Sequence, residues 1–257
     1  MSSAALLSIR HLSKAFAGLR AVQDFSVEVQ PGEVVGLIGP NGAGKSTIIN
    51  LVSGFHAADS GEVVFRGQSI LGQDPDRIAR LGMVRTFQHI RLFPSLTVRE
   101  NVEAAAQSRS TVSLVDALLR TRHYRQAMAE MERKADDLLR LFEVANVDAQ
   151  LAGTLPYGHQ RRIEIVRALA TEPSLLLLDE PAAGMNDVEA AALADFLASV
   201  ASSHGLALIL VEHHLDLVMR LCQRVVVLDH GATLAAGTPA EVTRHPEVVR
   251  AYLGEVV

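Results

Sequence analysis

The chain has 257 residues, and its 24 lysines and arginines against 29 aspartates and glutamates give a formal net charge of −5 with the histidines neutral. Only 21% of the residues are charged, which excludes a basic nucleic-acid coat protein and a polyacidic tail. Hydrophobic residues make up 49%, aromatic residues 4%, and tryptophan is absent. We therefore expect a globular α/β protein with an aliphatic core.

The sequence carries no pattern typical of membrane insertion or export. Its longest aliphatic stretches, 175–178 and 206–211, are far shorter than the roughly 20 residues that cross a bilayer. The first ten residues, MSSAALLSIR, lack the basic start and the apolar run of a signal peptide. Cys222 is the only cysteine, so no internal disulfide can form. These features predict a cytosolic protein in a reducing compartment.

The first part of the chain predicts strands around a glycine-rich loop. Phe25, Val27 and Val29 alternate with polar residues, and a second β-rich run, 63–65, lies between glycines, so both are expected to be half-buried strands. Residues 34–38 are apolar on both faces and predict a buried strand. The segment GPNGAGKST follows at once, and the helix-compatible IINLV comes after it.

Residues 100–147 are predicted to be mostly helical. Glu130 with Lys134, and Asp136 with Arg140, have the i,i+4 spacing of ion pairs on a solvent-exposed helix face. We interpret the stretch as a helical subdomain inserted into an α/β core. Apolar residues recur in it at helical spacing, which is typical of a buried stripe: Met128, Met131, Ala135, Leu138, Leu139 and Phe142.

Helices and strands alternate after this stretch. Residues 160–170 predict a helix that ends before Pro173, because proline disfavours the helical conformation in the residue before it. The buried strands 175–178 and 206–211 are separated by an alanine-rich helix, 188–200. Such alternation predicts a parallel sheet with right-handed crossovers.

The last segment, VVVLDHGATLAAG, predicts a β-hairpin that turns at 229–231, and a short helix is expected after it. Taken in order, the predicted elements belong to the α/β class.

The glycine-rich segment fits the phosphate-binding pattern GxxxxGK[ST] and has the strand before it and the helix after it that the pattern requires. Its glycines let backbone N–H groups wrap a phosphate at the positive end of the helix. Lys45 is expected to bridge the β- and γ-phosphates of ATP, and Ser46 to hold Mg²⁺. The residues expected to bind ATP are Gly39, Pro40, Asn41, Gly42, Ala43, Gly44, Lys45, Ser46 and Thr47.

The segment LLLLDE places two carboxylates at the carboxyl end of a predicted buried strand, where open parallel sheets bind their ligands. Asp179 can belong to the magnesium shell, and Glu180 can orient and polarise an attacking water. A strand that ends in Asp-Glu is often only a solvated strand end. Together with the glycine loop, however, the pair predicts a catalytic site.

With these motifs, the chain resembles the ATP-binding cassette (ABC) ATPase family over nearly its whole length. The resemblance implies that Phe16, in SKAFAG, stacks on adenine. It implies that Gln88, in RTFQ, senses Mg²⁺ and the γ-phosphate, and that His213, in VEHH, contacts the γ-phosphate. Glu180, His213 and Gln88 would then be the catalytic residues. The magnesium ligands would be Ser46, Gln88 and Asp179.

The segment LPYGHQ occupies the place of the family's signature motif, which implies contact with ATP held by a partner subunit. It departs from the usual LSGGQ or LSYGQ at Pro156, where serine is usual, and at His159, where glutamine is common. Residues 183–186 match the loop that crosses the dimer interface, with Asn186 in place of the usual aspartate. The signature residues are Leu155, Pro156, Tyr157, Gly158, His159 and Gln160.

The resemblance implies a P-loop NTPase core with a parallel sheet, an N-terminal antiparallel β subdomain and an inserted helical subdomain. Residues 1–257 would form one ABC ATPase domain. Its catalytic core would comprise 1–98 and 172–257, and its helical subdomain, with the signature motif, would comprise 99–171.

RTFQ, LPYGHQRRIEIVRALA and DEPAAGMN together most resemble the ATPase subunits of branched-chain amino acid importers. The implied function is ATP hydrolysis coupled to uptake of branched-chain or other hydrophobic amino acids, peripherally on the cytoplasmic side of the inner membrane. The implied partners are a second ABC ATPase subunit in a homo- or heterodimer, two transmembrane permeases and, indirectly, a periplasmic or extracellular solute-binding protein, with no nucleic acid. Two alternatives are a lipopolysaccharide-export ABC ATPase and a soluble non-transport ABC ATPase.

Coupling to a permease would need a surface near Gln88. We expect contacts there with a short helix of the membrane partner from Arg85, Phe87, Arg91 and Phe93.

Overall fold

The computed structural model describes residues 4–108, 112–142 and 144–253, and the chain divides into two compact units. The first unit comprises residues 1–88 and 174–257, and the second comprises 89–173. The second unit therefore begins earlier than the expected boundary at residue 99. The reason is local, because Phe93 N–H donates to Asn101 Oδ1 at 2.8 Å and Ala152 N–H donates to Leu96 O at 3.0 Å.

An antiparallel sheet of four strands forms one layer of the first unit, in the order β2-β1-β4-β5. Leu7, Ile9 and Leu12 of β1 are buried and lie opposite Val29, Val27 and Phe25 of β2, so the alternating pattern faces the core. The strands at 25–29 and 63–65 are confirmed within longer ones. The bounds are β1 Leu7–Phe16, β2 Leu19–Val29, β4 Ser60–Phe65 and β5 Gln68–Ser69.

The second layer is a six-stranded sheet in the order β10-β9-β3-β8-β7-β6. Neighbours from β9 to β6 pair in parallel, whereas β10 pairs antiparallel with β9, so the predicted parallel sheet and terminal hairpin are both confirmed. Every residue of β3, β7 and β8 is buried, which explains their continuous apolar runs. The bounds are β3 Val34–Ile38, β6 Met83–Arg85, β7 Leu175–Asp179, β8 Ala207–Val211, β9 Arg224–Asp229 and β10 Ala232–Gly237.

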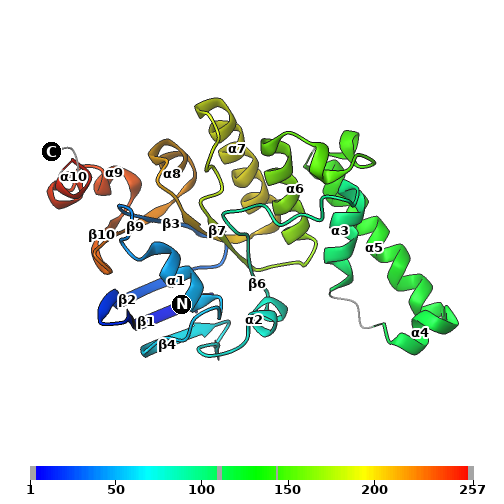
Figure 1. Cartoon of the computed structure of the whole chain (residues 1–257), viewed down its shortest axis with the longest axis horizontal. Coiled ribbons are helices and arrows are strands. Elements are labelled where there is room, and N and C mark those ends of the chain that lie inside the picture. The colour runs from blue at the N-terminus through cyan, green and yellow to red at the C-terminus, as the bar shows by residue number, and fades with distance from the viewer. Residues whose placement is uncertain (1–3, 109–111, 143, 254–257) are drawn as a thin grey trace. The chain divides into compact units, whose positions relative to one another are not determined.

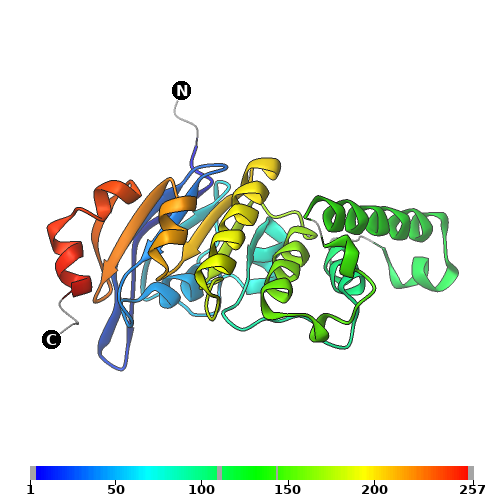
Figure 2. The same cartoon turned by 90° about the horizontal axis from the view of Figure 1, so that it is seen from above.

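Helix α1 lies between the two sheets (Figure 1). Its buried side chains, among them Ile48, Ile49 and Val52, join one hydrophobic core with residues of both sheets. Helices α7 and α8 pack against each other (Figure 2). The helices of this unit are α1 Lys45–Val52, α2 Pro75–Leu81, α7 Asp187–His204, α8 Leu215–Leu221, α9 Pro239–Val242 and α10 Pro246–Leu253.

The second unit is helical, as predicted, and packs Ala135 and Leu139 of its longest helix inward. Glu130 and Lys134 form the expected ion pair at 3.4 Å. The helices are α3 Val98–Gln107, α4 Leu114–Leu119, α5 Arg122–Leu141 and α6 Tyr157–Leu169, with short 3-10 helices η1 Ala145–Val147 and η2 Ala152–Thr154. No helix in the described part of the chain is long and apolar enough to span a membrane.

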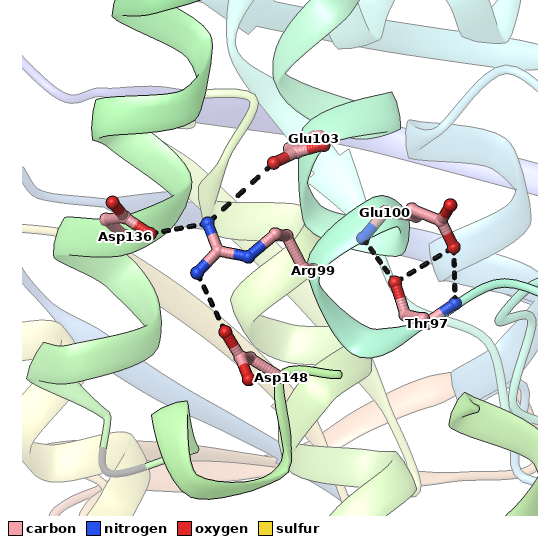
Figure 3. A network of polar contacts seen from close by, with 6 residues as sticks. All are labelled: Thr97, Arg99, Glu100, Glu103, Asp136 and Asp148. Atoms are coloured by element: carbon pink, nitrogen blue, oxygen red, sulfur yellow. Dashed lines mark hydrogen bonds and ion pairs between the residues drawn. The ribbon is translucent and has the colours of Figure 1, made fainter. Parts of the chain in front are cut away.

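Arg99 joins three segments of the second unit (Figure 3). Its guanidinium contacts Asp136 of α5, Asp148 after η1 at 2.7 Å, and Glu103 at 3.9 Å. The predicted pair of Asp136 with Arg140 is therefore wrong, since Asp136 turns to Arg99 instead. Beside this network, Thr97 and Glu100 form a capping box that starts α3.

Candidate nucleotide-binding site

At two positions of the glycine-rich loop, the backbone adopts a conformation that only glycine tolerates. Gly39 follows β3 directly with φ 150°, and a Cβ there would lie 2.2 Å from the carbonyl oxygen of Leu228. Gly44 has φ 100°, and its Cβ would lie 2.3 Å from the carbonyl oxygen of Ala21. Both glycines are therefore fixed by positive φ and by close backbone contact.

The loop leads into the N-terminus of α1, whose first turn is Lys45, Ser46 and Thr47. This turn carries no carboxylate, and Gly44 at the N-cap has no side chain to accept the free N–H groups. The positive end of the helix and the glycine loop thus form a cradle suited to an anion such as a phosphate.

Lys45 is buried, with 6% of its surface exposed. Its Nζ donates to Gly39 O at 2.7 Å and to Pro40 O at 2.9 Å, so the ammonium group lies against the loop it follows. Burial lowers the pKa of Lys45, and the negative charges of Glu180 and Asp179 oppose that effect.

The cradle opens into a cleft of about 410 Å³. Glu180 lies on this cleft with Lys45 and Ser46, so the structure brings the loop and one predicted catalytic carboxylate together. Five further lining residues were not predicted from the sequence: Leu19, Arg20, Ala21, Gln23 and His230. His230 and its neighbours arrive through the turn of the terminal hairpin, where Gly231 N–H donates to Ala43 O at 3.1 Å, a long-range contact that no local pattern encodes.

Phe16 is not among the described residues that line this cleft. It ends β1 with 41% of its surface exposed. Its ring meets His56 edge-on at 5.6 Å, and the Nζ of Lys14 lies 5.3 Å from the ring centre. The predicted stacking of Phe16 on adenine therefore stays a prediction.

Asp179, the last residue of β7, lies in a buried polar cluster. Arg85 donates to its Oδ2 at 2.8 Å and to Asn50 Oδ1 at 2.6 Å. The Arg85 guanidinium also lies 5.5 Å from the ring centre of Phe55 and 5.0 Å from that of Phe87. Only 10% of the Arg85 side chain is exposed. Arg85 therefore faces inward, contrary to the expectation that it contacts a membrane partner.

Glu180 adopts a left-handed conformation, with φ 47°, which is uncommon for a residue other than glycine. Its backbone N–H donates to Val211 O at 2.9 Å, and its Oε2 accepts from Gln88 Nε2 at 2.9 Å. The structure thus brings together two of the three predicted catalytic residues.

Glu212 was not among the predicted site residues. It is fully buried and accepts three backbone N–H groups, from Ala182 at 2.8 Å, His213 at 3.0 Å and His214 at 3.2 Å. The predicted catalytic His213 has a half-exposed side chain, and its Nδ1 lies 3.9 Å from Glu212 Oε2. Glu212 therefore joins the loop after Glu180 to the loop that carries His213.

Asn186 caps α7. Its side chain accepts Glu189 N–H at 3.0 Å, and the Glu189 carboxylate accepts Asn186 N–H at 3.1 Å, which completes a capping box. Asparagine and aspartate serve equally as N-caps, so the departure from aspartate keeps this helix start intact.

The predicted signature residues form the start of α6 in the second unit. Pro156 is the N-cap, and Gln160 Nε2 donates to Leu155 O at 2.7 Å. Tyr157 and His159 are exposed. Arg161, fully buried, donates to Glu164 Oε2 at 2.6 Å and to the Tyr157 hydroxyl at 3.2 Å. These buried contacts of Arg161 behind the signature residues were not predicted, because an Arg three residues before a Glu on a helix usually forms a surface ion pair.

The donor set also suits ATP with Mg²⁺. The cradle offers backbone N–H groups and a lysine to phosphates, while Ser46 and Asp179 offer the oxygen ligands that Mg²⁺ prefers. The fold and this cleft are those of a P-loop nucleotide triphosphatase.

Comparison with known proteins narrows the class. The family model described as ABC transporter matches residues 22–183, and a model described as branched-chain amino acid ATP-binding cassette transporter matches residues 232–257. The chain is 43% identical, over 97% of its length and 98% of the relative's, to the high-affinity branched-chain amino acid transport ATP-binding protein LivG of Escherichia coli (strain K12). The chain belongs to the ABC transporter family and is an ATPase of that family.

Other relatives and structures agree with this assignment. The branched-chain amino acid transport ATP-binding protein BraF of Pseudomonas aeruginosa is 39% identical over 97% of this chain and 98% of its own. The lipopolysaccharide export system ATP-binding protein LptB of Escherichia coli (strain K12) is 32% identical over 98% of both chains. A crystal structure of an ABC transporter cassette in its ADP conformation is 30% identical, with a TM-score of 0.85, and covers 98% of this chain and 100% of its own.

Proposed function

We propose that this chain is the ATP-hydrolysing subunit of an importer for branched-chain or other hydrophobic amino acids. The observation that carries the proposal is the shared cleft of Lys45 and Glu180 in a chain that matches LivG along nearly its whole length. The model matched at residues 232–257 supports the same substrate class. LptB is the less similar relative, so lipopolysaccharide export is the second candidate.

The residues of the cradle would bind the phosphates of ATP. The N–H groups of Gly39 to Thr47 would contact the phosphate oxygens, and Lys45 would leave its loop carbonyls to bridge the β- and γ-phosphates. Ser46, Gln88 and Asp179 would hold Mg²⁺. When bound, the ion would neutralise charge that develops on the phosphates.

Glu180 would orient and polarise the attacking water. Its carboxylate accepts a hydrogen bond from Gln88, so the position of the water would depend on the Gln88 side chain. His213 would contact the γ-phosphate. Glu212 accepts the backbone N–H groups of Ala182 and His213, and so fixes the loop after Glu180 and the loop that carries His213. Phe16 would stack on adenine from the end of β1.

The signature residues Leu155 to Gln160 would contact ATP held by a second ABC ATPase subunit, in a homo- or heterodimer. Closure around ATP and reopening after hydrolysis would then drive two permease subunits, to which a periplasmic or extracellular binding protein delivers the solute. The chain would lie peripherally on the cytoplasmic side of the inner membrane.

The test is uptake of radiolabelled leucine by cells that lack the gene. We expect the wild-type gene to restore uptake, and the Glu180→Gln variant to be made in equal amount without restoring it. Unlabelled isoleucine and valine should compete with leucine, whereas glutamate should not. Normal leucine uptake in the deletion, together with an outer-membrane lipopolysaccharide defect, would support the export function instead.

A further inference from the structure

Helix α4 of the second unit exposes its apolar face. Val115, Leu118 and Leu119 have 63%, 83% and 69% of their surface exposed. Their i, i+3, i+4 spacing places them on one face of the helix. Three large aliphatic side chains on one face of a six-residue helix form an unusually concentrated apolar surface for a water-soluble segment.

Three exposed arginines follow this face closely along the chain. Arg120 is the C-cap of α4, and Arg122 and Arg125 lie in the first turns of α5, all with exposed side chains. Within the described residues none of the three forms an ion pair. Further along α5, by contrast, Arg133 pairs with Asp137 at 2.9 Å and Lys134 with Glu130 at 3.4 Å. We call the six residues the α4 tip: Val115, Leu118, Leu119, Arg120, Arg122 and Arg125.

The positions of Arg122 and Arg125 are unfavourable for the isolated helix α5. The first turn of α5 carries Arg122, His123 and Arg125 and no carboxylate, although the positive end of a helix favours negative side chains. Such a local conflict in a sequence is typical of a functional surface. An anionic partner would remove the conflict.

The α4 tip is held in a fixed shape by the turn beneath it. Ser113 and Asp116 form a capping box at the start of α4, and the Thr121 hydroxyl donates to Asp116 Oδ1 at 2.9 Å. Thr121 in turn accepts Tyr124 N–H at 3.2 Å and starts α5. The negative charge of Asp116 is engaged in the turn, so the exposed side of the tip is apolar and positive.

We propose that the α4 tip contacts the anionic headgroup region of a lipid bilayer. Aliphatic side chains bordered by arginines suit such an interface, because the aliphatic groups enter the acyl boundary while the guanidinium groups stay among the phosphates. The tip lies at one end of the helical unit (Figure 1). A protein groove is the less favoured partner, since three neighbouring arginines that form no ion pair within the described residues match a dense phosphate layer.

The test is co-sedimentation of the purified full-length chain with protein-free vesicles, without nucleotide. We expect binding to vesicles of phosphatidylethanolamine with phosphatidylglycerol, and little binding to phosphatidylcholine. The triple variant Arg120→Gln, Arg122→Gln, Arg125→Gln should bind about 10²-fold more weakly, at about fivefold per arginine. Leu118→Ser with Leu119→Ser should cost about tenfold.

Two controls match these changes. One control is a triple variant that removes three exposed arginines elsewhere and has the same net charge as the triple tip variant: Arg77→Gln, Arg244→Gln, Arg250→Gln. Val188→Ser removes an aliphatic side chain with 79% exposure from α7. Both should bind as the wild type does, and all variants should unfold at the wild-type temperature.

Absence of vesicle binding by the wild type, or equal weakening by the tip and control variants, would overturn the proposal. Tip-dependent binding that appears only when vesicles contain the permeases would assign the surface to a protein partner and overturn the lipid contact. The readout needs no ATP, so it is independent of the proposed enzymatic function.

Discussion

The carboxylate of Glu212 accepts the backbone N–H of Ala182 at 2.8 Å, just beyond the point where β7 and β8 end. The last backbone hydrogen bond between these two strands joins Glu180 N–H to Val211 O. At Glu180 the chain turns, because this residue has φ 47°. Beyond this point the Glu212 side chain connects the two segments, because it also accepts the N–H groups of His213 and His214. One buried carboxylate thus sets the separation of the Glu180 and His213 loops.

We therefore expect Glu212→Gln to lower kcat about 10²-fold, because small displacements of catalytic groups cost about that much. An amide keeps the shape but presents an NH₂ group to backbone donors, so the free energy of unfolding should fall by about 1 to 3 kcal/mol. ATP affinity should change little. Steady-state ATPase kinetics, nucleotide binding and urea unfolding measure the three quantities.

Glu33→Gln is the control, because Glu33 also accepts a backbone N–H, that of Gln30 at 2.8 Å, and is paired with Arg224, away from the cleft. It should lose stability without a comparable loss of kcat. A double variant Glu212→Gln, His213→Ala should be no slower than His213→Ala alone. Additive losses would mean that Glu212 does not act through the His213 loop.

Lys45→Ala is expected to abolish ATP binding or leave it very weak, and Lys45→Arg should not restore it. Lys45 is 6% exposed and two loop carbonyls hold its ammonium group, in a space that a planar guanidinium does not fit. Equilibrium binding of a fluorescent ATP analogue measures the effect. Wild-type hydrolysis by either variant would contradict the role of Lys45.

Glu180→Gln should keep ATP affinity but slow turnover by about 10²- to 10⁴-fold, the usual contribution of a positioned base. It should also accumulate an ATP-bound dimer, visible by size-exclusion chromatography. The amide can still bond to Gln88, so the local geometry should survive. Normal turnover would transfer the role of base to another group, with His213 the next candidate.

Cys222 should resist alkylation while the chain is folded. Burial raises the pKa of its thiol from 9.0 to about 12, and the charge of Glu212 adds to the rise. Because the folded pKa lies above the unfolded one, the neutral thiol contributes stability that is complete below about pH 9 and is lost as the pH rises toward 12.

The free energy of unfolding of wild type relative to Cys222→Ala should accordingly decrease between pH 9 and pH 11. Iodoacetamide at pH 8.5 should label Cys222 rapidly in urea and slowly without it. Equal labelling rates in the two conditions would show that the thiol is accessible in the folded chain.

Much of the fold could be predicted because the determinants are local. Residues 34–38 and 175–178 form buried strands since every side chain there is apolar, and Gly39 and Gly44 define a loop that no other residue allows. Asp179 and Glu180 could be placed by the same logic, as residues that follow a buried strand.

The remaining determinants lie in contacts between distant segments. Arg85 resembles a surface residue in the sequence, and only the approach of Asn50 and Asp179 shows that it is buried. Asp136 and Arg140 have the i,i+4 spacing of an ion pair, yet Asp136 binds Arg99, which lies 37 residues earlier in the sequence. Glu212 precedes two histidines, and its role depends on Ala182, 30 residues earlier.

Pro156 is the N-cap of α6, with φ −56° and ψ 150° and no side-chain cap. A serine suits this backbone, and its oxygen could accept the N–H of His159, which typically stabilises a helix by about 1 kcal/mol. Loss of the proline constraint costs about 0.4 to 1 kcal/mol through a looser unfolded chain. The two effects nearly cancel, so Pro156→Ser should change the free energy of unfolding by less than about 1 kcal/mol.

The effect of Pro156→Ser on the dimer should be larger than its effect on the monomer. The hydroxyl can still donate its proton to the γ-phosphate held by a partner subunit, a charge-assisted bond worth about 1.5 to 3 kcal/mol when well aligned. In a Glu180→Gln background, in which hydrolysis is slow, Pro156→Ser should therefore lower the ATP concentration at which dimers form. Light scattering during an ATP titration measures this concentration. Pro156→Ala is the control, since it releases the proline constraint without adding a donor. An unchanged or raised midpoint for the serine variant would mean that this residue does not reach the γ-phosphate, or that the backbone N–H groups of the loop already satisfy it.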